Sequence, residues 1–361
     1  EKVVVALASE LRDRFGPLPP AAKRLVALAK LRVACAAAKI SNIDAKDRRA
    51  VFYKVGSRDV AFVRDLKGKT TDRKLKELTG RAYKLYDYVG AADAEYVVVA
   101  MGSGCDTLHE TVDALVKEGK KVGLLKVHLY RPFSMKDFVK AIPASVKVIT
   151  VLDRTKEPGA GGEPLYLDVK AAFADRADLT IIGGRYGLAS KEFTPSMVYA
   201  VYKHLDGKCT HNFTVGINDD VTNLSLEEKP APDTAPAGTI ACKFWGLGGD
   251  GTVGANKNSI KIIGDHTDKY IQAYFQYDSK KTGGITISHL RFGDTPIKSP
   301  YYINKADFVA CHNQAYLKKY DMVSDVKPGG TFLLDCQWTD AELDAHLPAS
   351  VKSYIANNGV K

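Results

Sequence analysis

The sequence predicts an α/β protein with two doubly wound parallel-sheet domains, preceded by a small α+β module. Two observations favour this architecture. From about residue 79 onward, apolar strands alternate with amphipathic helices, and a proline-rich stretch divides that region in two. With 361 residues, 45% of them hydrophobic and 26% charged, the chain is long enough to build two or three ordinary cores.

The first module, residues 1–78, begins with a predicted helix at 3–15 that stops at Gly16-Pro17. A second helix is expected around residues 25–33, and short strands at 50–55 and 60–63. The net charge of the whole chain is +10, and residues 1–90 hold 21 Lys and Arg against 10 Asp and Glu. Because these charges alternate with acidic and apolar residues, the pattern favours a solvated helix face over a nucleic-acid surface.

The second region, residues 79–226, is predicted to form the first parallel sheet, because right-handed crossovers join successive strands through helices. The expected strands are 95–100, 122–129, 147–152 and 179–182, and the expected helices are 106–118, 135–142 and 165–173.

Residues 227–238 contain three prolines and almost no large apolar side chain, which predicts an extended linker. The third region, residues 239–361, again alternates strands and helices. Its expected strands are 239–245, 270–277, 284–290, 308–310 and 330–334.

The strongest local motif is the glycine-rich run from Gly246 to Gly254 (G-L-G-G-D-G-T-V-G), directly after a predicted strand and before a predicted helix at 255–264. Glycines in this position let backbone N–H groups and a helix N-terminus approach a phosphate. Three interpretations stay open on spacing alone: a nicotinamide dinucleotide site, a site for another diphosphate such as coenzyme A, and a structural turn. Asp278 would suit a ribose, whereas Lys280 and Lys281 would suit a phosphate.

Two long stretches resemble pyruvate:ferredoxin oxidoreductases. Residues 242–260, 273–275, 278–281, 288–293 and 306–313 are similar to the gamma-type, Rossmann-like domain of that family. Residues 78–88, 98–103, 123–127, 129–133 and 153–160 are similar to its domain II, which resembles the C-terminal domain of transketolases. The resemblance covers residues 79–361 in the family's order and implies that the gamma-type domain is truncated at its C-terminus.

The resemblance implies oxidative decarboxylation of pyruvate with coenzyme A, in anaerobic electron transport to ferredoxin or flavodoxin. The candidate coenzyme A contacts are Gly248, Gly249, Asp250, Gly251, Thr252, Lys280 and Lys281. Thiamine diphosphate, Mg and 4Fe-4S clusters would be bound by other parts of the enzyme, so no catalytic residue is expected in this chain. The implied partners are those remaining domains, ferredoxin or flavodoxin through them, and a second copy in a homodimer.

The first 78 residues resemble a different family. Residues 10–19, 28–32, 40–44 and 68–75 are similar to the C-terminal domain of bacterial transcription-repair coupling factors, an accessory domain without the helicase motor. The alternative function is therefore an interaction module whose basic N-terminal domain recruits a DNA-repair partner.

The remaining signals are weaker. The loop from Asp153 to Glu163, with Arg154, Lys156 and Glu157, is interpreted as an interdomain contact surface with local ion pairs, or alternatively as an anion contact. The six scattered cysteines and eight histidines lack metal-ligand spacing, and the Ser288-His289 and Cys311-His312 pairs are expected to be structural. No apolar run reaches the roughly 18 residues of a membrane span, and no secretory signal is visible, so we expect a cytoplasmic protein.

Overall fold

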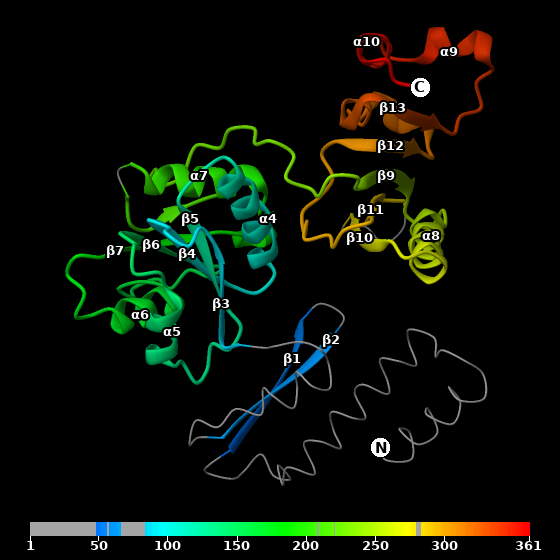
Figure 1. Ribbon diagram of the computed structural model, residues 1–361. Helices are drawn as coiled ribbons and strands as arrows, with labels where there is room; N and C mark the ends of the chain where they lie inside the picture. The colour runs from blue at the N-terminus through cyan, green and yellow to red at the C-terminus, as the bar shows by residue number, and fades with distance from the viewer. Residues whose placement is uncertain (1–47, 56–57, 66–83, 208, 220, 279–282) are drawn as a thin grey trace, which may run out of the picture. The chain divides into compact units, whose positions relative to one another are not determined.

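The computed structural model describes residues 48–55, 58–65, 84–207, 209–219, 221–278 and 283–361 (Figure 1). The chain forms two compact units, residues 1–85 and 86–361. In the first unit, β1 (Arg48–Val55) pairs antiparallel with β2 (Arg58–Asp65), as the strand pattern predicted. The two helices predicted in the first 33 residues lie outside the described residues, and the domain boundaries proposed from the sequence stay predictions.

The first sheet of the second unit has the strand order β3-β5-β4-β6-β7-β8. Every neighbouring pair is parallel except β3 with β5, which is antiparallel. The central strands are almost wholly apolar because helices cover both faces of the sheet. The strands are β3 (Tyr86–Gly90), β4 (Tyr96–Met101), β5 (Val122–Val127), β6 (Val148–Asp153), β7 (Thr180–Arg185) and β8 (Phe213–Thr214).

Two helix pairs cover the first sheet. The helices α4 (Gly104–Lys117) and α7 (Pro195–Leu205) contact each other and share one core cluster with the alternate strand residues Val98, Leu124 and Ile182. The helices α5 (Met135–Ala141) and α6 (Pro164–Ala172) form the second pair, which lies on the other face (Figure 1). This arrangement confirms the doubly wound α/β class.

The second sheet has the order β10-β11-β9-β12-β13. The strands β9, β12 and β13 are parallel, whereas β11 runs antiparallel to both β9 and β10. This half of the sheet is antiparallel because residues 278–284 join β10 directly to β11, and so short a connection cannot make a parallel crossover. The strands are β9 (Ile240–Leu247), β10 (Tyr270–Tyr277), β11 (Ile285–Gly293), β12 (Ala306–Cys311) and β13 (Val326–Leu334).

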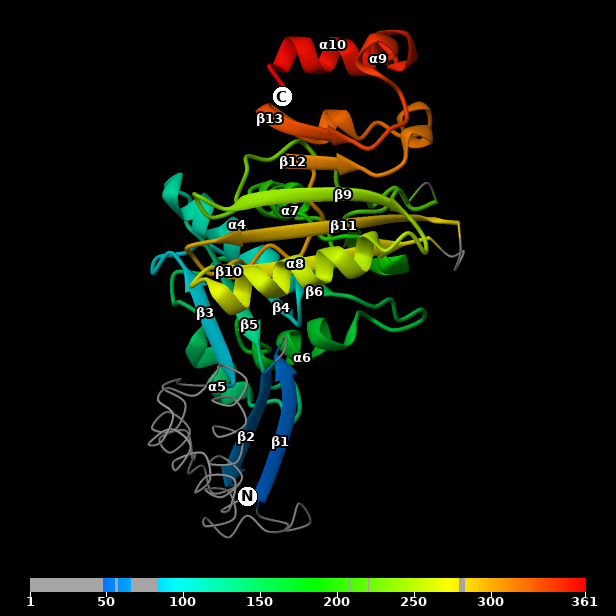
Figure 2. The same cartoon turned by 90° about the vertical axis from the view of Figure 1, so that its right-hand side faces the viewer.

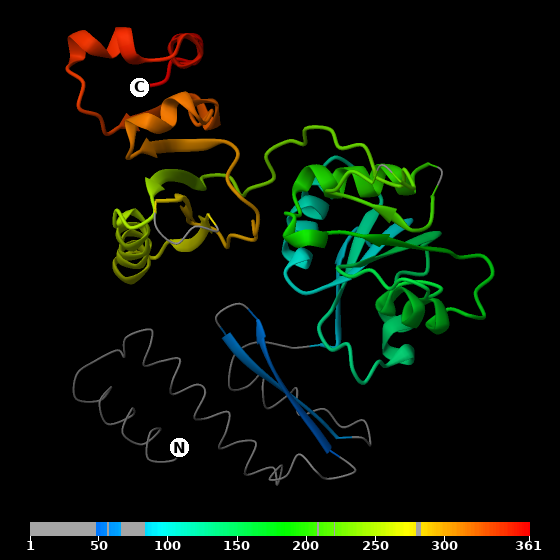
Figure 3. The same cartoon turned by 180° about the vertical axis from the view of Figure 1, so that it is seen from behind.

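The helix α8 (Thr252–His266) lies along β9, β10 and β11 (Figure 2). The other face packs against the 3-10 turns η2 (Gln314–Lys318) and η3 (Val323–Asp325) and against α10 (Ala349–Asn358), which follows α9 (Asp340–His346). Residues 227–238 contain no helix or strand and connect the two sheets (Figure 3). Among the described residues, no helix is long and apolar enough to cross a membrane.

Candidate functional site

The glycine-rich segment forms the strand–turn–helix predicted from the motif. The strand β9 ends at Leu247 and α8 begins at Thr252, so Gly248–Gly251 make the turn. Gly249 and Gly251 have φ angles of 100° and 90°, a region that side chains rarely adopt. A Cβ on Gly246 would lie 2.5 Å from Thr252 Oγ1, so glycine is needed for the helix to begin this close to the strand.

Asp250 holds the turn together from inside. Its Oδ2 accepts hydrogen bonds from the Leu247 N–H at 2.7 Å and the Thr252 hydroxyl at 2.8 Å, and its Oδ1 accepts one from the Thr252 N–H at 2.7 Å. Burial raises the pKa of Asp250, but these hydrogen bonds and nearby His312 together hold it below its usual value. The carboxylate is therefore part of the framework of the turn, and its contact with coenzyme A stays a prediction.

Backbone donors remain at the start of α8. Among the residues that the structure describes, the N–H groups of Gly251, Val253 and Gly254 have no hydrogen-bond acceptor. Such donors, together with the positive end of the helix dipole, favour an anion at this position. Gly254 is exposed and its backbone does not have a positive φ, so this position can carry a side chain.

His312 approaches the same turn from the neighbouring parallel strand. It follows β12, its N–H donates to Trp245 O at 2.9 Å, and its Nδ1 lies 2.8 Å from Thr252 Oγ1. Because the Thr252 hydroxyl donates its proton to the ionised Asp250, the proton of the second bond must reside on His312 Nδ1. This hydrogen-bond order leaves Nε2 as an acceptor in the neutral ring.

The turn and His312 flank a topological switch point. From β9 the chain passes through α8 toward β10 and β11 on one side, whereas β12 lies on the other side of β9. In open α/β sheets, ligands bind outside the carboxyl ends of strands at such a point. Local sequence could not show this neighbourhood, because it depends on the strand order.

The residues proposed for the far side of the site are only partly described. Lys280 and Lys281 lie outside the described residues. Asp278 follows β10, and β11 separates β10 from β9. Two strand spacings, about 9 to 10 Å, therefore lie between Asp278 and the turn, whereas a dinucleotide fold places the ribose-binding acid on the adjacent strand. The topology disfavours the nicotinamide interpretation.

The loop after β6 is held by buried acids at both ends. Asp153 accepts the N–H groups of Leu165 and Tyr166 at 3.1 Å, which caps α6, and burial raises the pKa of Asp153 despite those bonds. Glu163 forms a buried ion pair with Arg185 at 2.6 Å. The Glu163–Arg185 pair is a local ion pair of the kind expected for this loop, whereas the interdomain contact expected there stays a prediction.

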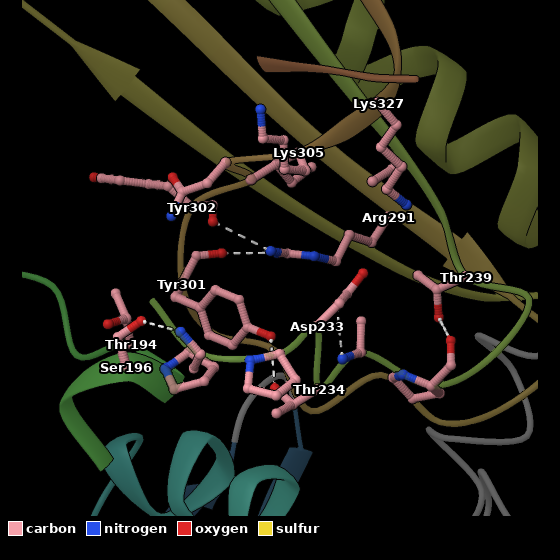
Figure 4. Close-up of a pocket in the computed structure, with 18 of the residues that line it drawn as sticks. Thr194, Ser196, Asp233, Thr234, Thr239, Arg291, Tyr301, Tyr302, Lys305 and Lys327 are labelled. Atoms are coloured by element: carbon pink, nitrogen blue, oxygen red, sulfur yellow. Dashed lines mark hydrogen bonds between the residues drawn. The ribbon is translucent and has the colours of Figure 1, made fainter. Parts of the chain in front are cut away.

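A cavity of about 360 Å³ lies between residues 231–239 and 301–305 (Figure 4). Arg291 is 4% exposed, and its Nη1 donates to the backbone oxygens of Ser299 and Tyr301. Lys327 pairs with Asp307, and Lys305 donates to Ser324 O, so each of these cations already has partners. We interpret the polar wall of this cavity as framework.

A buried carboxylate ties three segments together beside this cavity. Glu110, on α4, is 5% exposed and accepts hydroxyl hydrogen bonds from Thr234 at 2.7 Å, Tyr301 at 2.5 Å and Ser299 at 2.5 Å. Burial and the Glu110 charge raise the pKa of Tyr301, which keeps its hydroxyl protonated as a donor. Glu110 therefore joins α4 to the linker and to the segment before β12, and sequence reasoning did not single it out.

The Ser288-His289 pair has the structural role expected from the sequence. His289 is 1% exposed and bonds Gln276 Oε1 and the Ile303 N–H. In the part of the chain that the structure describes, no group of three His, Cys, Asp or Glu residues could hold a metal, and five cysteines are free thiols: Cys105, Cys209, Cys242, Cys311 and Cys336.

Comparisons with known proteins find similar families at both ends of the chain. Residues 241–361 match the family model described as pyruvate ferredoxin/flavodoxin oxidoreductase, and residues 94–198 match core domain II of pyruvate:ferredoxin oxidoreductase. Residues 1–63 match the TRCF domain. Among solved structures, a pyruvate oxidoreductase subunit from Thermotoga maritima covers 30% of this chain and 57% of its own length at 18% identity, but its TM-score of 0.26 is too low to support an argument.

Curated relatives are much closer in sequence. A pyruvate:ferredoxin oxidoreductase from Moorella thermoacetica is 60% identical over 286 residues, which is 79% of this chain and 24% of the relative. A pyruvate-flavodoxin oxidoreductase from Enterobacter agglomerans is 58% identical over 293 residues, 80% of this chain and 25% of the relative. The chain thus spans about a quarter of the length of these relatives. The resemblance noted in the sequence is confirmed: this chain is similar to the TRCF domain at its start and, beyond it, to two consecutive domains of the pyruvate:ferredoxin oxidoreductase family.

Proposed function

We propose that residues 86–361 serve as part of a pyruvate:ferredoxin or pyruvate:flavodoxin oxidoreductase, and that the turn from Gly246 to Gly254 contacts coenzyme A there. The observation that carries the proposal is the 60% identity over 286 residues, together with matches to two of the family's domains in succession. The reaction would be oxidative decarboxylation of pyruvate to acetyl-CoA and carbon dioxide.

The geometry of the turn supports the coenzyme A contact. Open N–H groups at the start of a 15-residue helix lie at a switch point of the sheet, next to the ring of His312. A diphosphate presents oxygens to such donors, and Lys280 and Lys281 would add positive charge. The strand order β10-β11-β9 favours this ligand over a nicotinamide dinucleotide.

The proposal gives this chain a binding and connecting role. Thiamine diphosphate and its Mg would carry decarboxylation, and 4Fe-4S clusters would carry electrons to ferredoxin or flavodoxin, all held by other parts of the enzyme. The partners of this chain would be those parts and a second copy of the enzyme in the cytoplasm. Glu110 and its three hydroxyl partners would hold the two sheets at a fixed position relative to each other, so that the contacts with the rest of the enzyme are made together.

The test is calorimetric titration of the full chain with coenzyme A, comparing Gly254→Glu with Gly254→Gln. Both side chains fit, since a Cβ on Gly254 meets nothing within 4 Å. Only the first adds negative charge beside the open N–H groups. Repulsion of roughly 1 to 2 kcal/mol predicts a Kd about 5 to 30 times higher for the Glu variant than for the Gln variant.

Protein stability provides the control. Both variants replace a helical glycine, and a carboxylate in the first turn also suits the helix dipole, so neither should unfold more easily than the parent chain. Weaker binding by the Glu variant with undiminished stability would support the site. Equal affinity for coenzyme A in both variants, or no binding by the parent chain, would exclude it.

The alternative, an interaction module that recruits a DNA-repair partner, has less support. The observation that supports this alternative is the TRCF match over residues 1–63, and this match covers far less of the chain than the oxidoreductase similarity does. It would require DNA-repair partner binding that disappears when residues 1–78 are removed.

A further inference from the structure

A second cavity lies at the carboxyl ends of strands in the first sheet, away from the glycine-rich turn. Its volume is about 160 Å³. The segment after β4 contributes Ser103 and Gly104, the segment after β6 contributes Arg154, and the segment after β7 contributes Tyr186. Ser190, Lys191, Glu192 and Tyr302 also belong to the lining.

This cavity occupies the topological switch point of its sheet. From β4 the chain passes through α4 to β5 on one side, and then through α5 to β6 on the other side of β4. The loops after β4 and β6 therefore diverge and leave a crevice between them, which is where open parallel sheets bind ligands.

Arg154 is held at the cavity by one edge of its guanidinium group. Its Nε donates to Gly187 O at 3.3 Å, and a Cβ on Gly187 would lie 2.7 Å from that same Nε. Arg154 is exposed, and within the described part of the chain its terminal Nη1 and Nη2 groups have no hydrogen-bond partner in the protein. The fork that recognises carboxylate and phosphate groups is therefore open.

The charges on the lining favour an anion. Two cations, Arg154 and Lys191, and one acid, Glu192, line the cavity, and Glu192 Oε1 accepts the Tyr302 N–H at 2.6 Å. Burial raises the pKa of Glu192 more than that hydrogen bond and the charges of Arg291 and Lys243 lower it. The acid is thus engaged with the backbone, and the two cations leave the cavity positive.

The loop that contributes Ser190 to the lining has an unfavourable backbone conformation. Within the short turn η1 (Leu188–Ser190), Ala189 and Ser190 have φ angles of 54° and 58°, which side chains other than glycine rarely adopt. Ser190 belongs to the lining. Strained residues of this kind cluster at ligand-binding segments, where the strain fixes a shape that the ligand needs.

We propose that this cavity binds a small oxyanion, a carboxylate or phosphate group on a molecule of few heavy atoms, with Arg154 as its main cationic contact. The volume sets the size of the ligand, since pockets for drug-sized molecules span roughly 300 to 1,000 Å³. The volume therefore favours a ligand smaller than a nucleotide. The site is separate from the turn proposed to contact coenzyme A and does not depend on that assignment.

The experiment is calorimetric titration of the full chain with inorganic phosphate and, in a second series, with pyruvate as a small carboxylate. Arg154→Gln is compared with Lys156→Gln, because each removes one positive charge from the same loop and Lys156 is not in the lining. We expect one site per chain for at least one anion, at least tenfold weaker binding in the Arg154 variant, and less than about twofold change in the Lys156 variant. The anion that binds identifies the ligand group as phosphate or carboxylate.

Three results would overturn the proposal: equal weakening in both variants, unchanged binding in the Arg154 variant, or no saturable binding of either anion up to roughly 20 mM, well above millimolar affinity. If Arg154→Gln unfolds, Arg154→Lys serves instead, because it keeps the charge but lacks the fork and should still weaken binding. Coenzyme A affinity should be the same in every variant.

Discussion

Replacing Glu110 with Ala should destabilise the second unit severely. The substitution removes a carboxylate that is 5% exposed and leaves the hydroxyls of Thr234, Ser299 and Tyr301 without their acceptor. Ser299 is fully buried, so water cannot replace the lost partner there without rearrangement.

The magnitude follows from the three hydrogen bonds. Each bond to a charged acceptor is worth about 1.5 to 3 kcal/mol, but their sum overestimates the effect because the variant no longer buries a charge. The Thr234 and Tyr301 hydroxyls, 3.3 Å apart, can also bond each other. We therefore expect a loss of about 3 to 5 kcal/mol in the free energy of unfolding. Glu110→Gln keeps one acceptor oxygen and should lose only about 1 to 2 kcal/mol.

The assay is thermal unfolding of the full chain, followed by tryptophan fluorescence. Both tryptophans, Trp245 and Trp338, belong to the second sheet and its surroundings, so the signal reports the lobe that Glu110 anchors from α4. For domains of 150 to 250 residues, about 1 kcal/mol corresponds to 2 to 4 °C. The Ala variant should therefore melt about 10 °C below the parent chain, and the Gln variant about 4 °C below it.

Asp113→Ala is the matched control, because Asp113 lies on the same helix with its side chain 46% exposed in an ion pair to Lys298. An exposed pair contributes about 0 to 1 kcal/mol. If Glu110→Ala lowered the melting temperature no more than this control, the three hydroxyl contacts would not anchor the second lobe, and the reasoning would fail.

Three further predictions concern other parts of the second unit. Gly246→Ala places a Cβ 2.5 Å from Thr252 Oγ1, so urea unfolding should show a loss of about 2 to 3 kcal/mol; an unchanged midpoint would mean that the turn is looser than described. Burial, then the charges of Lys243 and Arg291, lower the pKa of His289 to about 3, below its unfolded value near 6.5. The free energy of unfolding therefore suffers no loss from His289 above pH 6.5, and it falls by up to about 1.4 kcal/mol per pH unit between pH 6.5 and 3, where the unfolded chain binds the proton more tightly. His289→Gln should make the free energy of unfolding depend less steeply on pH in this range. An identical slope in the variant would refute the assignment. Arg185→Ala leaves Glu163 buried without its ion-pair partner and should lower the free energy of unfolding by about 3 to 5 kcal/mol. Replacing both Arg185 and Glu163 with Ala should restore part of that loss. If the losses of the two single variants simply added in the double variant, the pair would not be coupled.

Elements with strong periodicity were predictable from sequence. The strand expected at 270–277 matches β10 residue for residue, and the helix expected at 106–118 begins two residues later than α4. The glycine pattern fixed the strand–turn–helix at residues 246–254, because positive φ angles and close backbone approach both demand glycine. Elements with weak local signals were missed: β3, β8, α7, α9 and α10.

The site was less predictable, since its parts meet through strand order. His312 lies beside Thr252 only because β12 neighbours β9, although 60 residues separate them. In the sequence, Glu110 resembles any acid on the solvent face of an amphipathic helix. It is buried because Ser299 and Tyr301, which are distant in the sequence, pack against it and donate hydrogen bonds to it. The antiparallel β10–β11 pairing could have been predicted, because only six residues separate the strands expected at 270–277 and 284–290, too few for a parallel crossover.

The anchor at Glu110 has a consequence for how the second unit reaches its native state. Its partners are 124, 189 and 191 residues away along the chain, so these contacts are among the most non-local in the protein. Contacts of this kind form late, after the entropy of closing a long loop has been overcome. Until then, the carboxylate stays in water and α4 can fold without it. Docking of the second sheet, rather than formation of either sheet, should therefore set the slowest step of folding, and a chain cut within residues 227–238 should dock at a rate that depends on concentration.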